Sequence, residues 1–241
     1  MLREDRQEAR LRRLPKRQGP SASEIRQIQP QVRLFREKTR QRRKDARKDP
    51  FRLQKVRGIP SGSQQWQCGS AGGKATDRKA ILTITYPEFR FQFGFLIAKG
   101  NARSALGKLA LLRKLLGAGY AGIFQCNLSD NGPEFARFHE IEEWGVGAFF
   151  ANPYRSTDKA SCERNHEFIR CVVPKGRSLD GLAQAKVETL FPRINPYVRG
   201  SNENRTPYEL MLARFGEGFM EAIGVKRIPA KDVLLKPSLL K

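Results

Sequence analysis

The sequence predicts an α/β domain in which helices flank a mixed β-sheet, preceded by a basic, partly helical N-terminal arm. Aromatic residues at positions 89, 91, 93 and 95 alternate with polar residues or glycine, which is the period of a strand with one buried face. Apolar residues between 106 and 116 recur at spacings of three and four, which is the period of a helix. Strands and helices that alternate along one chain indicate an α/β fold.

The arm, residues 1–58, is defined by its charge. It holds 20 Lys or Arg against 7 Asp or Glu, with few apolar residues at any period. Ser21 and Glu24 have the spacing of a capping box for a short helix that ends before Pro30. We expect the arm to become ordered mainly on a polyanion, and the alternative is a tail that only keeps the protein in solution.

Composition narrows the function classes. The 241 residues include 46 Lys or Arg and 24 Asp or Glu, a net charge of +22, which makes nucleic acid the first candidate partner. No stretch approaches the ~18 apolar residues of a membrane span, and the start of the chain does not have the pattern of a secretory signal. The four cysteines form no C-x-x-C pair, so we expect reduced thiols in a cytoplasmic protein.

The globular part begins near Gly58 with a hairpin. Residues 79–86 (KAILTITY) are rich in β-branched side chains and predict a buried strand. Pro87 and Glu88 predict a turn into the alternating strand 89–95. The helix that follows is capped by Asn101 or Ser104 and ends at Gly117.

The second half alternates short strands with helices. We expect strands at 123–128 and 149–151, a helix-like stretch at 135–144 that contains His139, and a helix at 163–173 that stops at Pro174. Two more amphipathic helices are predicted at 181–195 and 207–223. Thr206 is the expected cap of the last one and Gly224 its end.

Two carboxylates stand where an α/β enzyme places reactive groups. Asp130 follows the strand 123–128 directly, at its carboxyl end, although Asp-Asn-Gly is also a common turn. Glu163 shares one helical face with His166, Glu167 and Arg170. The alternative interpretation is that this face is only a solvated surface with salt bridges.

Several segments together resemble a known family. Residues 129–135 (SDNGPEF) are similar to the T-D-N-G-x-E-F motif of DDE transposases and retroviral-type integrases, whose catalytic core is ribonuclease H-like. The order of the motifs more narrowly resembles the insertion-sequence-thirty (IS-thirty) family of bacterial transposases, over residues 64–241. The other matching segments are 149–154 (FFANPY), 162–170 (CERNHEFIR), 173–176 (VPKG), 204–210 (NRTPYEL) and 234–241 (LLKPSLLK).

The resemblance implies a site of three carboxylates that hold two Mg²⁺ (or Mn²⁺) ions for phosphodiester cleavage and strand transfer. Asp130 corresponds to the second carboxylate and Glu163 to the third. Gly69 stands where the family has its first Asp, and Asp77 falls about eight residues too late to replace it. A second family Asp is Asn152 here.

The resemblance also implies duplex DNA as partner, a homo-oligomer, and a cytoplasmic, nucleoid-associated location. It divides the chain into the arm, an integrase-like catalytic core at 64–213, and a C-terminal helix and tail at 214–241. The residues expected to contact DNA or to support the site are Lys159, Arg164, Asn165, His166, Arg170 and Lys175.

The sequence therefore predicts a transposase-like or integrase-like protein whose own strand transfer is very low or absent, because the first Asp is missing. The alternative is a DNA-binding remnant without catalysis. A basic RNA-binding or ribosome-associated protein is a third reading, supported by composition only. With only two histidines, a Ser-His-Asp or Cys-His hydrolase has little support.

Overall fold

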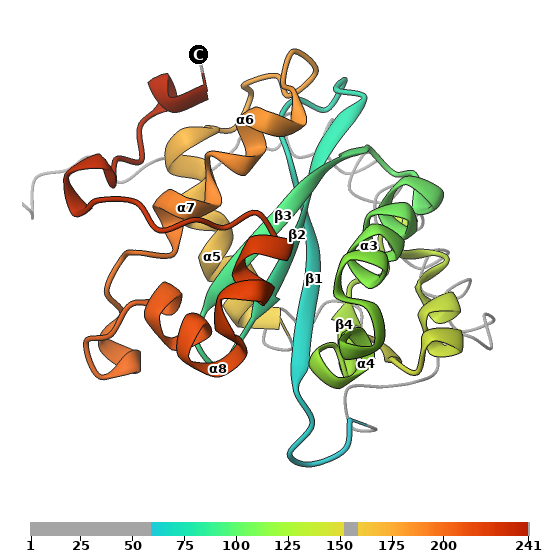
Figure 1. The fold of residues 1–241 in the computed structure, drawn as a ribbon. Coiled ribbons are helices and arrows are strands. Elements are labelled where there is room, and N and C mark those ends of the chain that lie inside the picture. Colours follow the sequence, from blue (N-terminus) through green and yellow to red (C-terminus); the bar gives the residue numbers. More distant parts are fainter. Residues whose placement is uncertain (1–58, 152–158, 241) are drawn as a thin grey trace, which may run out of the picture. The chain divides into compact units, whose positions relative to one another are not determined.

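The computed structural model describes residues 59–151 and 159–240 (Figure 1). The predictions for the arm and for Asn152 lie outside the described residues. Within them, a five-stranded sheet has the order β3-β2-β1-β4-β5. The strands are β1 (Gln65–Gly72), β2 (Lys79–Tyr86), β3 (Phe91–Ala98), β4 (Cys126–Ser129) and β5 (Gly147–Phe150).

The sheet is mixed. The pairs β1–β2 and β2–β3 are antiparallel, whereas β1–β4 and β4–β5 are parallel. Helices lie against it, so the predicted class, a mixed sheet flanked by helices, is confirmed (Figure 1). Although glycines weaken strands in general, β1 is paired on both sides and runs for eight residues.

The hairpin of β2 and β3 is confirmed, with a longer turn than expected. Its register runs from Lys79 opposite Ala98 to Tyr86 opposite Phe91. The second strand thus begins two residues after the predicted start at 89, because residues 87–90 form the turn. The Arg90 amide donates to the Pro87 carbonyl over 3.2 Å, and Arg90 itself has a positive φ of 54°.

Side-chain caps begin two of the longer helices. Of the two caps offered by the sequence, Asn101 is the one used, since its side chain accepts a hydrogen bond from the Ser104 amide. Thr206, the predicted cap of the last helix, forms a capping box with Glu209. The α-helices are α3 (Ala102–Leu116), α4 (Tyr120–Ile123), α5 (Ala160–Val172), α6 (Gln184–Glu188), α7 (Phe191–Ile194) and α8 (Pro207–Ala222). The 3₁₀ turns are Gly117–Gly119, Pro133–Phe135, Phe138–Trp144, Gly200–Asn202, Ala230–Asp232 and Pro237–Leu240.

Several predicted elements differ in their extent, among them the helix expected at 163–173, which begins at Ala160, and the strand expected at 149–151, which is Gly147–Phe150. The strand expected at 123–128 starts only at Cys126, because Ile123 ends α4. The single helix expected at 181–195 is two short helices, α6 and α7. Pro192 explains the break, because proline has no amide hydrogen and its ring collides with the carbonyl four residues earlier, that of Glu188.

Successive residues of β1 face opposite sides of the sheet, and this separates the core from the candidate site. Trp66 is fully buried on one face, with ring centroids 6.3 and 6.1 Å from Phe215 and Phe219 of α8. Gly69 faces α5 on the other side. Helix α8 is kinked at Gly216, which has a φ of 78°.

Helix α8 includes residues on both sides of the expected boundary at 213, and the division into a core and a C-terminal segment stays a prediction. Within the described residues, no helix combines the length and the apolar character that crossing a membrane requires.

Candidate active site

The parallel pairing of β1 and β4 places Gly69 level with Asp130. Gln65 lies opposite Cys126 and Gln67 opposite Leu128, so the same register carried two residues further sets Gly69 beside Asp130. Both residues alternate onto the face of the sheet that α5 covers. The position expected for the first carboxylate is therefore adjacent to the second in space, and it carries no side chain.

Asp130 lies at the carboxyl end of β4, as predicted, and both of its oxygens are engaged. Oδ1 accepts a hydrogen bond from the Gly132 amide at 3.0 Å, which makes the local turn. Oδ2 accepts one from the Lys159 ammonium at 3.3 Å. The neighbouring Asn131 ties this turn to the end of β5, since its side-chain amide donates a hydrogen bond to the Ala151 carbonyl at 3.0 Å.

Lys159 directly precedes α5 and is unusually enclosed for a lysine. Its side chain is 8% exposed, whereas that of Asp130 is 50% exposed. Its ammonium also lies 5.7 Å from the centre of the Phe135 ring, within the range of a cation–π contact. The ion pair is thus solvated mainly from the carboxylate side.

The space beside Gly69 is filled from α5. A Cβ at this position would lie 2.8 Å from Cys162 Sγ and 3.3 Å from His166 Cε1. Burial raises the pKa of the Cys162 thiol, so the thiol is protonated at neutral pH. A carboxylate at position 69 would therefore require Cys162 to move.

His166 is held by a short hydrogen-bonded chain. The Thr83 hydroxyl donates to the Gly69 carbonyl at 3.1 Å and lies 2.7 Å from His166 Nε2. Because that hydroxyl has only one proton, Nε2 is assigned as the donor to it. Burial lowers the pKa of His166 from its ordinary value of 6.5 to about 4, so the ring is neutral at pH 7.

The remaining predicted site residues, on or just after α5, are either buried or exposed to solvent. Asn165 is buried, and its side-chain amide donates to the Arg90 carbonyl at 3.0 Å, which ties the helix to the β2–β3 turn. Glu163 is exposed and lies in the first turn of α5. Arg164, Arg170 and Lys175 are exposed as well, so their predicted contact with DNA is sterically open.

Asp77 stabilises a loop and is not a member of the candidate site. Its carboxylate accepts hydrogen bonds from the Ser178 hydroxyl at 2.7 Å and from the Leu179 and Lys74 amides at 2.9 and 2.8 Å. The Ser178 bond is the main reason that the pKa of this carboxyl is lowered. Asp77 lies beyond the end of β1, in agreement with the expectation that it cannot replace a ligand at position 69.

Sequence reasoning missed Glu134, which belongs to the same motif as Asp130. A Cβ at Gly132 would lie 3.0 Å from Asp130 Oδ1 and 3.0 Å from Glu134 Oε2, so the two carboxylates are neighbours across this glycine. Glu134 is buried and accepts a hydrogen bond from the Ser70 hydroxyl. Its four-residue separation from Asp130 was the available signal.

The described residues do not fit a pair of metal ions. Position 69 offers no ligand, and the oxygen of Asp130 that points away from its own turn is paired with an ammonium. Across residues 59–151 and 159–240, no three His, Cys, Asp or Glu side chains gather closely enough to hold a metal.

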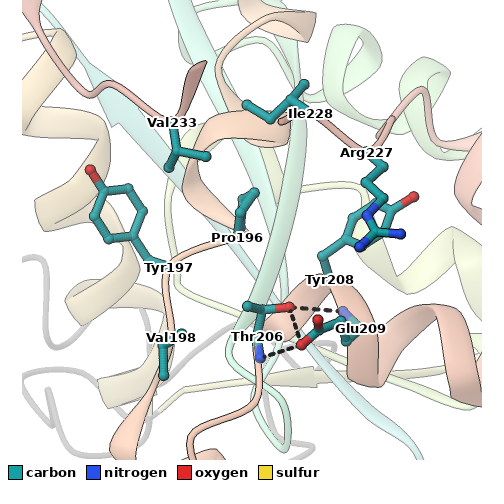
Figure 2. A pocket seen from close by; sticks show the side chains of 9 residues that line it. All are labelled: Pro196, Tyr197, Val198, Thr206, Tyr208, Glu209, Arg227, Ile228 and Val233. Atoms are coloured by element: carbon teal, nitrogen blue, oxygen red, sulfur yellow. Dashed lines mark hydrogen bonds between the residues drawn. The ribbon is translucent and has the colours of Figure 1, made fainter. Parts of the chain in front are cut away.

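A pocket of about 410 Å³ lies elsewhere, at the start of α8 (Figure 2). It contains none of the predicted site residues. Figure 2 shows the Thr206–Glu209 capping box at its edge. Its lining residues are Pro196, Tyr197, Val198, Thr206, Tyr208, Glu209, Arg227, Ile228 and Val233.

Two curated relatives are transposases. The probable transposase for insertion-like sequence element IS1161 of Streptococcus salivarius is 28% identical over 131 residues, which is 54% of this chain and 36% of that protein. The transposase for insertion sequence element IS4351 of Bacteroides fragilis is 28% identical over 82 residues, 34% of this chain and 25% of that protein. This chain is similar to insertion-sequence transposases.

The resemblance to transposases is thus confirmed, while the narrower IS-thirty family stays a prediction. The aligned parts span about a third or less of the length of these relatives. Among solved structures, the catalytic core domain of BIV integrase is similar with a TM-score of 0.44 and 23% identity, covering 63% of this chain and 95% of that domain. No protein-family model matches the chain.

Proposed function

We propose that this chain is a transposase-like protein that binds duplex DNA and breaks phosphodiester bonds very slowly or not at all. The observation that carries the proposal is Gly69. The β1–β4 register, extended two residues from the Gln67–Leu128 pair, sets it level with Asp130, and Cys162 fills the space that a carboxylate would need. The similarity to transposases supports the class, and the missing ligand supports the low activity.

The chain's own residues account for binding. Arg164, Arg170 and Lys175 are exposed on or just after α5, the helix that also carries the exposed Glu163. Cations in this arrangement contact phosphates, and the net charge of +22 attracts a polyanion over longer range. We propose duplex DNA as partner, a homo-oligomer as assembly, and a nucleoid-associated, cytoplasmic location.

Bound Mg²⁺ or Mn²⁺ would polarise a phosphate and activate the attacking hydroxyl in an active relative of this kind. Gly69 and Lys159 do not fit such a pair of ions, so the proposed function does not depend on bound metal. What remains is a site that receives the DNA backbone through its exposed cations.

Cleavage is tested with end-labelled duplex DNA in Mg²⁺ or Mn²⁺. We expect no product above background from the wild-type chain. Gly69→Asp combined with Cys162→Ala is the variant that restores the missing ligand without the 2.8 Å contact, and any gain in cleavage should appear there first. Wild-type cleavage that Asp130→Ala abolishes would contradict the proposal.

Binding is tested by titrating the full chain with a labelled 30-base-pair duplex at several salt concentrations. We expect the affinity to fall linearly on a double-logarithmic plot, with or without divalent metal. Arg170→Ala should reduce the slope by about one if that residue contacts a phosphate. The matched control is Lys114→Ala on α3, an exposed cation away from α5. A clear preference for RNA over duplex DNA would favour the RNA-binding alternative.

A further inference from the structure

We propose that the Lys159 ammonium, rather than a divalent cation, is the counter-ion of Asp130, so that the acidic site of this protein is closed to Mg²⁺ and Mn²⁺. The inference rests on the proposed function only in taking Asp130 as the acidic residue of the site. The juxtaposition that carries it is a 3.3 Å contact between a nearly buried ammonium and the carboxylate.

The first step is that Lys159 is held in place. Its side chain is only 8% exposed, and the ammonium lies between Asp130 and the face of the Phe135 ring. An unpaired ammonium is costly to bury, so the enclosed lysine is stable because the carboxylate stands next to it. Lys159 therefore belongs to the site itself, although the sequence suggested a phosphate contact for it.

The second step is that metal and ammonium compete for one oxygen. Oδ1 of Asp130 is occupied by the Gly132 amide, and Oδ2 by Lys159. A magnesium ion binds carboxylate oxygen at about 2.1 Å. A divalent cation on Oδ2 would thus stand next to the ammonium, and the two positive charges repel each other.

The third step is that, among the residues the structure describes, the side of Gly69 supplies a metal on Asp130 with no oxygen ligand that would offset this repulsion. The space at Gly69 contains the Cys162 thiol and the neutral ring of His166 instead of an oxygen ligand. One oxygen of the neighbouring Glu134 carboxylate, Oε1, is bonded to the Ser70 hydroxyl. The Lys159 ammonium and the filled space at Gly69 therefore both disfavour the binding of a divalent cation at Asp130.

Mn²⁺ alone is a suitable probe, because its free form is measured directly by electron paramagnetic resonance. The full chain is titrated without DNA as wild type, Lys159→Met, Lys159→Arg, Asp130→Asn and Lys159→Met/Asp130→Asn, with Lys114→Met as the charge-matched control. We expect at least a tenfold gain in Mn²⁺ affinity in Lys159→Met only. Lys159→Arg keeps the charge and should remain weak, and the double variant should lose the gain.

Two results would overturn the proposal. One is a Lys159→Met affinity no higher than that of Lys114→Met. The other is tight Mn²⁺ binding by the wild type that Asp130→Asn abolishes, and this comparison remains decisive if Lys159→Met fails to fold. Because DNA is absent from the titration, a failure of DNA binding would count against the proposed function and leave this test unaffected.

Discussion

The Lys159–Asp130 ion pair predicts an asymmetry in stability, because its two partners are buried to different extents. Asp130→Asn leaves an ammonium that is 8% exposed without its carboxylate. Lys159→Met removes the buried charge and leaves a carboxylate that is 50% exposed and reaches water. The less exposed residue should therefore be the easier one to replace.

The magnitudes follow from the geometry. At 3.3 Å and an effective dielectric constant of ~20, the attraction is about 5 kcal/mol before desolvation is subtracted. Breaking a buried pair by removing one partner costs ~3 kcal/mol or more when the other stays buried, whereas an exposed pair is worth ~1 kcal/mol or less. We expect Asp130→Asn to cost about 3 kcal/mol and Lys159→Met about 1 kcal/mol.

Urea unfolding of the two single variants and the double variant, at pH 7 and low salt, measures these costs. The double variant should resemble Lys159→Met, since both lack the buried charge, and the coupling between the two sites should be large. Each 1 kcal/mol corresponds to a change in Tm of roughly 2–4 °C for a unit of this size. A Lys159→Met variant less stable than Asp130→Asn would refute the reasoning.

Three further predictions concern the residues around the site. Gly69→Ala should cost ~1–3 kcal/mol through overpacking, and Cys162→Ala in the same chain should relieve most of it; additive costs in urea unfolding would contradict this. The pKa of His166 is lowered to about 4, so its contribution to the free energy of unfolding is complete above the ordinary pKa of 6.5. As the pH falls from 6.5 to 4, that contribution is lost, by on the order of 3 kcal/mol. His166→Gln should flatten the dependence of stability on pH in this range, and an unchanged dependence would contradict the assignment. Asp77 also has a lowered pKa, so Asp77→Asn should lower Tm at pH 7, and the difference from wild type should shrink below the ordinary pKa of 3.8; equal Tm values at pH 7 would show that its hydrogen bonds add nothing.

The hairpin of the sheet was predictable because its two strands carry their own signals. The β-branched run of β2 and the alternating aromatic residues of β3 have the period of strands whatever surrounds them. Boundaries were less predictable where neighbours decide them. Ile123 fits a strand by composition, but it belongs to α4, and the Trp66 indole donates a hydrogen bond to its carbonyl at 2.9 Å.

The sequence indicated which residues belong to the candidate site, but it did not indicate which side chains contact one another there. The motif around Asp130 gave the residue at the carboxyl end of β4, and the absence of an Asp at Gly69 was visible in the sequence. That Lys159 is enclosed depends on the Phe135 ring and on how α5 packs, which no local pattern specifies. The contact between the Gly69 position and Cys162 joins residues about 90 positions apart, and only the fold brings them together.

The central claim is that this protein has the position of a transposase acid at Asp130 but not the metal site. Crystals of the full chain soaked in MnCl₂, with data collected at the manganese absorption edge, test it most directly. The account predicts no anomalous peak at Asp130 and an ammonium of Lys159 within hydrogen-bond distance of Oδ2. A manganese ion on Asp130 and Glu163, with Lys159 displaced, would contradict it.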